Sequence, residues 1–175
     1  MKHLKLVSFI TGFVFIVFGS CSKKDNNDPV EGNVELYLIE SYSTVDNTME
    51  IDETSIITKQ QPLINYSDIL SYDADEYMFT ISENAKSTIQ SINVPVSGMP
   101  FALKANNEII YTGYFWPSFS STSCFWVVID PIQLILGNEL KVELGYPGLL
   151  EGQTIPDKRN DQRILAIFNR DGKLN

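Results

Sequence analysis

The most reactive side chains in this sequence belong to two cysteines, Cys21 and Cys124, and to a single histidine, His3. A cysteine acts as a nucleophile through its thiolate, and Cys21 directly follows the small residues Gly19 and Ser20. His3 lies in a segment that we expect to be removed, so the remaining chain contains no imidazole. We therefore expect neither histidine-dependent catalysis nor the usual histidine-containing metal sites.

The first 20 residues have the pattern of a cleaved export signal. Lys2, His3 and Lys5 precede an apolar and small stretch over residues 6–19. This stretch is shorter than the ~20 residues that span a bilayer comfortably. It ends in Phe18-Gly19-Ser20-Cys21, which resembles the lipobox of bacterial lipoproteins, with Phe18 where that family usually has leucine.

The lipobox resemblance implies cleavage before Cys21 and attachment of acyl chains to its thiol. Two or more chains, each contributing ~0.8 kcal/mol per buried CH₂ group, would hold the protein stably on a membrane. The alternative is an ordinary secretory signal with an unrelated cysteine. We expect a cell-envelope protein anchored by lipid, in an outer membrane, with the periplasmic and surface faces both open.

The chain divides into residues 1–20, the signal, residues 21–32, the lipidated cysteine with a tether, and residues 33–175, one globular domain. Residues 22–29 contain no apolar side chain, which favours a disordered tether. Loss of the signal removes Lys2 and Lys5 and changes the formal charge from −9 to −11. So acidic a surface argues against nucleic acid as a partner.

The hydropathy pattern predicts an α+β domain with a mainly antiparallel sheet, one central helix and one C-terminal helix. Ser82 is the expected N-cap of the central helix, and the pair Asn106-Asn107 is the expected turn of a hairpin. Residues 41–66 are hard to assign beyond a short strand at 54–58. The other predicted strands cover 34–40, 69–72, 77–81, 99–105, 108–116, 125–129 and 140–144, and the predicted helices cover 82–93 and 157–169.

Residues 77–116 resemble the periplasmic head domain of the SecDF protein-export subunit. The likeness lies in the strand and helix start Phe79-Thr80-Ile81-Ser82-Glu83-Asn84-Ala85-Lys86 and in the hairpin over residues 100–113. It implies a strand, a short capped helix and an apolar hairpin, and no active residue. As a whole, the chain resembles small bacterial envelope lipoproteins of no assigned activity, so this resemblance implies none.

Aromatic residues are the first candidates for a binding surface. Seven of them lie between Tyr111 and Trp126. A buried central strand accounts for most, and Trp116 and Phe119, beside a serine-rich loop, are the pair we expect to be exposed. With Tyr146, they could contact a glycan, a small molecule or a partner protein.

Basic residues supply a second candidate. Lys158, Arg159 and Arg163 are a local excess of positive charge in an acidic chain and could receive an anion at the start of the last helix. The alternative is a connecting loop capped by Asp157, with charge pairs along the helix.

Two further features favour structural roles. Cys124 has no nearby basic residue in sequence and is expected to be a buried, inert thiol. Asp73 and Asp75 could offer oxygens to calcium, yet a dedicated loop needs a glycine and further ligands, so a solvated turn is favoured. We predict no metal site and no cofactor.

Three functions remain open. The first is a non-catalytic binding or scaffolding domain, carried by a membrane-anchored lipoprotein and directed at another envelope protein. The second is a glycan or small-molecule binding module, which needs exposed rings around a concavity. The third is a hydrolase that uses paired carboxylates ~5 to 9.5 Å apart.

Overall fold

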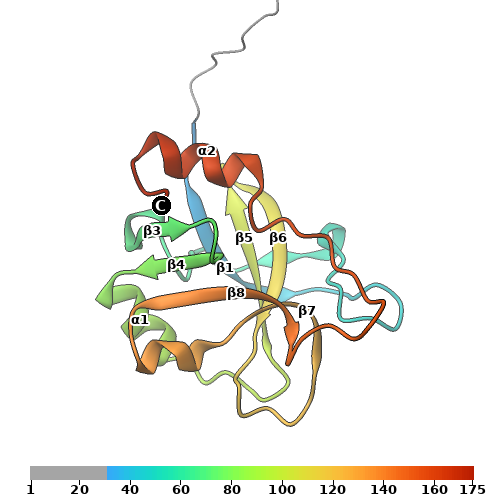
Figure 1. Ribbon diagram of the computed structural model, residues 1–175. Helices are drawn as coiled ribbons and strands as arrows, with labels where there is room; N and C mark the ends of the chain where they lie inside the picture. The colour runs from blue at the N-terminus through green and yellow to red at the C-terminus, as the bar shows by residue number, and fades with distance from the viewer. Residues whose placement is uncertain (1–30) are drawn as a thin grey trace, which may run out of the picture.

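The computed structural model describes residues 31–175 as one sheet of eight strands with two α-helices (Figure 1). The strand order is β2-β1-β5-β6-β7-β8-β4-β3, and every neighbouring pair is antiparallel except β6 and β7. The predicted α+β class is therefore confirmed. The predicted signal, Cys21 and nearly all of the tether lie outside the described residues.

The strands are β1 (Val34–Ser41), β2 (Ile57–Thr58), β3 (Ile69–Asp73), β4 (Met78–Ile81), β5 (Met99–Ala105), β6 (Glu108–Phe115), β7 (Cys124–Ile129) and β8 (Glu139–Tyr146). The helices are α1 (Glu83–Gln90) and α2 (Gln162–Arg170). Three 3₁₀ turns complete the list, η1 (Glu53–Ser55), η2 (Tyr66–Asp68) and η3 (Pro131–Ile135). Neither described helix is long and apolar enough to cross a membrane.

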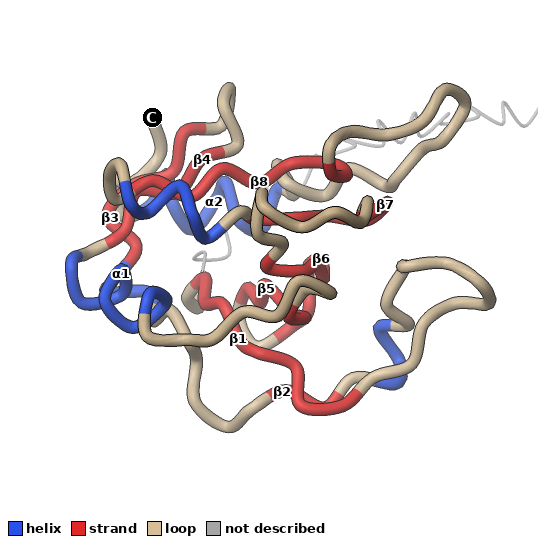
Figure 2. Tube along the Cα trace, turned by 90° about the horizontal axis from the view of Figure 1, so that it is seen from below, coloured by secondary structure: helices blue, strands red, loops and turns tan. Residues whose placement is uncertain are grey.

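The sheet curls strongly, so that β1, β5 and β6 run across the direction of β3, β4 and β8 (Figures 1 and 2). The two halves face each other and enclose one apolar core. Helix α2 contributes Phe168, which stacks on Tyr72 with ring centroids 5.4 Å apart. The core therefore joins α2 to the outer strands of the curled sheet.

The hairpin of β5 and β6 runs from one end of the domain to the other. It turns at Asn106 and Asn107, whose φ angles of 50° and 65° confirm the predicted asparagine turn. This turn lies beside the start of β1, where the amide of Asn106 donates to the carbonyl of Asn33. The opposite end of the hairpin, at Met99 and Phe115, is on the order of 20 Å away, at ~3.3 Å per residue.

Helix α1 begins as predicted, because the Ser82 hydroxyl accepts a hydrogen bond from the Ala85 amide. It ends at Gln90, three residues before the predicted end at 93. The chain after Gln90 turns toward Pro95 and the start of β5. The side chains that the helix buries are Ala85 and Ile89.

Helix α2 begins at Gln162 and not at Asp157. Asp161 provides the cap, since its carboxylate accepts from the Arg163 amide at 2.9 Å. Residues 157–160 bind the sheet instead, because the Tyr72 hydroxyl donates to the Arg159 carbonyl at 3.0 Å. Gly172, at a φ of 65°, follows the end of the helix in the left-handed conformation that commonly terminates helices.

Candidate functional site

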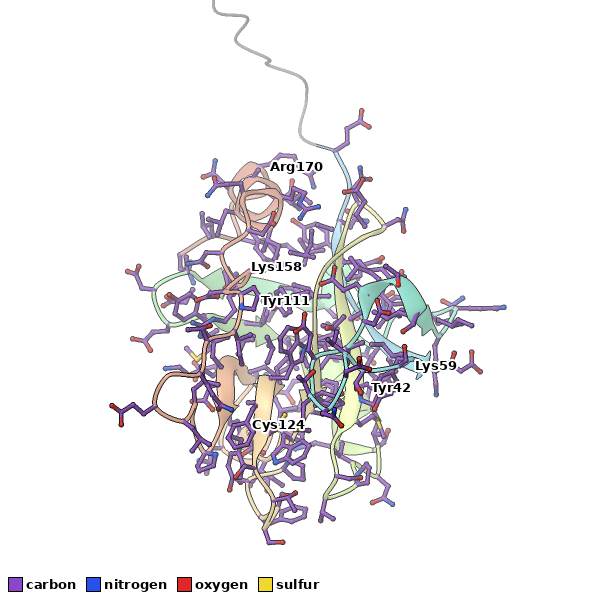
Figure 3. All side chains as sticks on the ribbon, turned by 90° about the vertical axis from the view of Figure 1, so that its right-hand side faces the viewer. Tyr42, Lys59, Tyr111, Cys124, Lys158 and Arg170 are labelled. Carbon is purple, nitrogen blue, oxygen red and sulfur yellow. The ribbon has the colours of Figure 1, made fainter. Side chains whose placement is uncertain are left out.

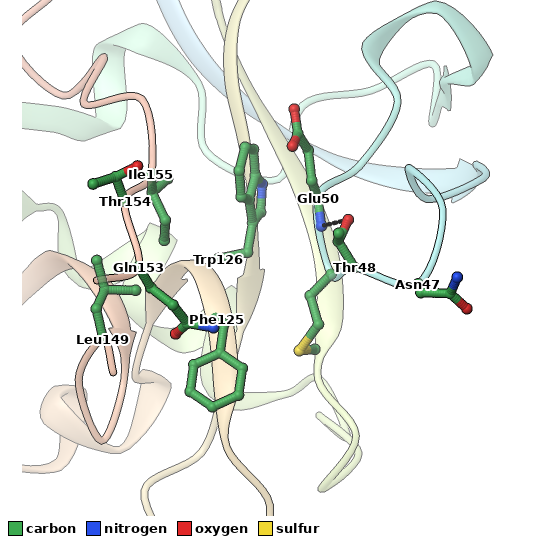
Figure 4. A pocket seen from close by; sticks show the side chains of 10 residues that line it. Asn47, Thr48, Glu50, Phe125, Trp126, Leu149, Gln153, Thr154 and Ile155 are labelled. Atoms are coloured by element: carbon green, nitrogen blue, oxygen red, sulfur yellow. Dashed lines mark hydrogen bonds between the residues drawn. The ribbon is translucent and has the colours of Figure 1, made fainter. Parts of the chain in front are cut away.

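A cleft of about 400 Å³, which we call the loop cleft, opens between residues 47–50 and 149–155 (Figure 4). Apolar side chains form its inner surface, and uncharged polar side chains with one carboxylate form its rim. The inner residues are Met49, Phe125, Trp126, Leu149 and Ile155, and the rim residues are Asn47, Thr48, Glu50, Gln153 and Thr154.

A β-bulge in β7 directs two consecutive aromatic side chains into the loop cleft. Cys124 pairs with Tyr146 and Val127 with Leu144, so β7 has one more residue than β8 between these pairs. In a regular strand Phe125 and Trp126 would point to opposite faces. The bulge removes this alternation, and both rings line the cleft.

Strand β6 holds the indole of Trp126 in place. Its Nε1 donates to the hydroxyl of Thr112 on β6, and the Thr112 side chain is fully buried. Gly113, next to it, has no side chain and lets β7 approach closely, because a Cβ there would lie 2.7 Å from the Val127 carbonyl oxygen. The Trp126 side chain at the inner surface of the loop cleft is therefore held in place.

Two long loops form the walls of the loop cleft, and both project on the same side of the molecule (Figures 1 and 2). The first joins β1 to β2 and is held by a bridge between Thr44 and Ile51. The second joins β8 to α2 and is held by a bond from the Leu150 amide to Gln153 Oε1 at 3.2 Å. Long ordered loops in a compact domain are commonly functional.

A second hollow of about 350 Å³, which we call the distal groove, lies at the end of the domain away from α2. The end of α1, residues 92–94, the segment after β6 and η3 surround it. Most of its lining is apolar, and Gln90 and Asn93 are the polar members. Its apolar lining consists of Ile89, Ile92, Val94, Pro117, Phe119, Pro131, Ile132 and Ile135.

Large apolar side chains at and near the distal groove are more than half exposed to water. Phe119 is 65% exposed, Ile135 69% and Leu136 94%, and Val96 on the neighbouring loop is 57% exposed. The Ser120 hydroxyl donates to the Val96 carbonyl at 2.7 Å, which ties the two loops together. An exposed apolar cluster of this kind is typical of a surface that another molecule covers.

The aromatic candidates from the sequence have different positions. Trp116 is only 3% exposed, so the expectation of an exposed ring is wrong. The loop before β5 covers it, and a Cβ on Gly98 would lie 2.5 Å from the indole. Phe119 is exposed as expected. Tyr146 is half-buried, and its hydroxyl donates to the Ser118 carbonyl.

The three basic candidates do not converge on one point. Each of them has a carboxylate partner, so the segment has the character of a loop with charge pairs. Lys158 pairs with Glu53, Arg159 with Asp157, and Arg163 with both Asp161 and Glu108. Arg159 also lies over the Tyr77 ring and donates to the Val142 carbonyl. Their positive charges are thus neutralised locally, which leaves little attraction for an anion.

Burial makes two side chains, Cys124 and Tyr111, harder to ionise. Cys124 is fully buried, as predicted, and burial raises the pKa of its thiol to about 11. Burial also raises the pKa of Tyr111 well above its ordinary value. Within residues 31–175 the Tyr111 hydroxyl has no hydrogen-bond partner. Figure 3 shows Tyr111 inside the body of the domain, with Arg170 on α2 and Cys124 to either side of it.

Carboxylates do not form an obvious catalytic pair at these hollows. Glu50 is the one acidic residue that lines the loop cleft, and no acid lines the distal groove. The described residues also contain no group of three or more potential metal ligands. The hydrolase hypothesis therefore receives no support from either hollow.

Sequence reasoning identified no residue of the loop cleft as a candidate, and Phe119 was its one candidate at the distal groove. The cleft brings together two loops about 100 residues apart, and the bulge that adds Phe125 depends on pairing with β8. Ile135 and Leu136 do carry a signal. They lie at the end of a short, mostly apolar segment between Pro131 and Gly137. A segment this short cannot turn all of its apolar side chains toward the core.

Comparisons with known proteins return no match, whether with family models, with curated proteins or with solved structures. The fold and its two hollows therefore have no assigned counterpart from which a function can be transferred. What the protein does has to be inferred from the chemistry of its own side chains.

Proposed function

We propose that the chain is a lipid-anchored protein of the cell envelope whose domain binds a second envelope protein without catalysing a reaction. The observation that carries this proposal is the exposure of Phe119 and Ile135, which line the distal groove, and of Leu136, which follows Ile135 in the chain. Isolated apolar residues are common on surfaces, but a contiguous cluster marks an interaction site.

The composition of the distal groove supports a protein partner. Its lining has no charged side chain, and its polar residues are the amides Gln90 and Asn93. Aliphatic and aromatic side chains of a partner would fill the apolar part, and the amides would bind its backbone. The exposed Phe119 ring is the kind of anchor that dominates such interfaces.

The position of the distal groove supports an anchored protein. The described chain starts at Glu31 beside the Asn106 turn, at the α2 end of the domain. The groove lies at the other end of β5 and β6. An anchor on Cys21 would therefore join the described domain at the end opposite the distal groove, and the groove would stay open to a partner.

Anchoring and partner binding need separate tests. Mass spectrometry of the protein extracted from membranes should find an acylated N-terminal Cys21, and a Cys21→Ser variant should be lost from the membrane fraction. A mature protein without acyl chains would contradict the lipid anchor, and it would not bear on partner binding at the distal groove.

Partner binding is tested by photo-crosslinking in intact cells. A photoreactive residue at position 119 or 136 should give a discrete product larger than the chain. The matched control is position 70, where Leu70 is also exposed and apolar but lies on β3. Equal products from all three positions, or none from 119 and 136, would contradict the proposal. A product of twice the chain mass would identify the partner as a second copy.

A further inference from the structure

The loop cleft has a chemistry different from that of the distal groove. Its inner surface is apolar, and its rim carries the amide of Gln153 and the hydroxyls of Thr48 and Thr154. From this arrangement we propose that the loop cleft binds a neutral saccharide of one or two rings. This proposal does not depend on the anchor or on the protein partner.

Stacking supplies the first reason. A sugar ring has one face of C–H groups, which packs well against an aromatic face. Phe125 is half-buried at the inner surface of the loop cleft, so part of its ring remains accessible. Trp126 is 8% exposed and lines the loop cleft from the next position along the strand. The bulge in β7 is what places both rings on one side, with Phe125 the more accessible of the two.

Hydrogen bonding supplies the second reason. The edge of a sugar ring carries hydroxyls that both donate and accept, and amide and hydroxyl side chains can do the same. Within the described chain, the side chain of Thr154 makes no hydrogen bond that competes for a ligand. Gln153 uses its oxygen on the Leu150 amide, which directs its remaining NH₂ donors outward.

Charge supplies the third reason. Glu50 is the one acidic residue on the rim, and the chain as a whole has a formal charge of −9. An anionic ligand would be repelled at such a site. A carboxylate can still accept hydrogen bonds from sugar hydroxyls, and such charge-assisted bonds are the stronger kind.

The size and stiffness of the loop cleft fit a small ligand. Its volume of about 400 Å³ lies within the range of about 300 to 1,000 Å³ typical of small-molecule sites. The turn at residues 45–50 is closed by a bond from the Thr48 hydroxyl to the Val45 carbonyl and one from the Glu50 amide to that hydroxyl. A preformed wall reduces the ordering that binding requires.

The test uses the full chain, purified in a detergent without a sugar headgroup. The probes are a panel of neutral mono- and disaccharides, with glucuronic acid as an anionic control and a short apolar peptide as a non-sugar control. Binding is followed by tryptophan fluorescence in a Trp116→Phe variant, in which Trp126 is the remaining tryptophan of the chain.

We expect at least one neutral saccharide to change the Trp126 emission in a saturable way. Phe125→Ala and Gln153→Ala should each weaken that binding by about tenfold, as expected for one well-placed contact. Phe119→Ala is the matched control, because this aromatic residue belongs to the distal groove, and it should leave binding unchanged.

Four results would overturn the saccharide site. They are no saturable change with any neutral saccharide, equal binding of glucuronic acid, stronger binding of the apolar peptide, or saccharide binding that survives Phe125→Ala. Circular dichroism of each variant establishes that it is folded before binding is measured. Since Phe125 is partly exposed and lies at a bulge, its truncation should leave the fold intact.

Discussion

The indole Nε1 of Trp126 lies 3.1 Å from the hydroxyl oxygen of Thr112 and donates a hydrogen bond to it. The bond joins β7 to β6 directly beneath the loop cleft. Thr112 is one of two buried polar residues among those that the structure describes, the other being Ser120. A hydroxyl is kept in this core because it gives the indole a partner.

Replacing Thr112 with valine should therefore destabilise the domain. The shape is kept, but the buried indole N–H loses its acceptor, which costs about 1 to 3 kcal/mol of unfolding free energy. Urea unfolding followed by circular dichroism measures the loss. Thr112→Ser retains the hydroxyl and serves as the control, with a smaller loss. Equal losses in both variants would show that the methyl group matters and the hydrogen bond does not.

Two buried tyrosines should respond in opposite ways to removal of the hydroxyl. Tyr111→Phe should leave the unfolding free energy unchanged or raise it by up to about 1 kcal/mol, because the Tyr111 hydroxyl has no partner within the described chain. Tyr72→Phe should lower it by about 1 kcal/mol. The Tyr72 hydroxyl bonds to the Arg159 carbonyl and to Asn160, and both bonds would be lost.

The same urea experiment distinguishes the two tyrosines without a change in method. A loss in Tyr111→Phe as large as that in Tyr72→Phe would mean that the Tyr111 hydroxyl is well paired after all. Hydrogen exchange at residues 159–161 adds a second readout, and it should accelerate in Tyr72→Phe alone.

Alkaline pH should weaken the fold. Burial raises the pKa of Cys124 from 9.0 to about 11 and contributes most to raising those of Tyr37 and Tyr66 from 10.0 to about 12. Each group is protonated in the folded state at pH values where the unfolded chain has lost the proton. The contribution of these groups to stability is therefore present in full below the ordinary pKa of the thiol, 9.0, and is lost as the pH rises, through about 11 for Cys124 and through about 12 for the two tyrosines.

Cys124→Ala checks the origin of this decline. The variant should be less stable at every pH, since it leaves a small cavity, but the part of the decline that begins near pH 9.0 should disappear. The measurement is the urea midpoint as a function of pH. An unchanged slope in the variant would assign the whole decline to the tyrosines.

The elements that the sequence predicted correctly are those with local causes. Val34, Leu36 and Leu38 alternate in β1 and are buried, and Ser82 caps α1 through its own hydroxyl. The start of α2 was misplaced because Asp157 and Asp161 are equally good caps in sequence. Bonds to residues far away in sequence, such as the one from Tyr72, 87 residues away, hold residues 159 and 160 on the sheet and decide between them.

The candidate sites depended on contacts that a sequence does not display. Trp116 and Phe119 are three residues apart beside the same serine-rich loop, yet one is covered by the segment around Gly98 and the other is not. The loop cleft required a register change between β7 and β8. Phe119 alone among the aromatic candidates could be assigned to a surface hollow in advance.

Both borders of the sheet are shielded from other chains. Strand β2 has two residues, and beyond it Leu36 is bridged to Ile64. At the other border, Leu174 bridges Tyr72 on β3. A crowded layer of such molecules would find few unpaired backbone groups from which to start intermolecular strand pairing. The borders of this sheet therefore offer a second molecule little backbone for strand addition.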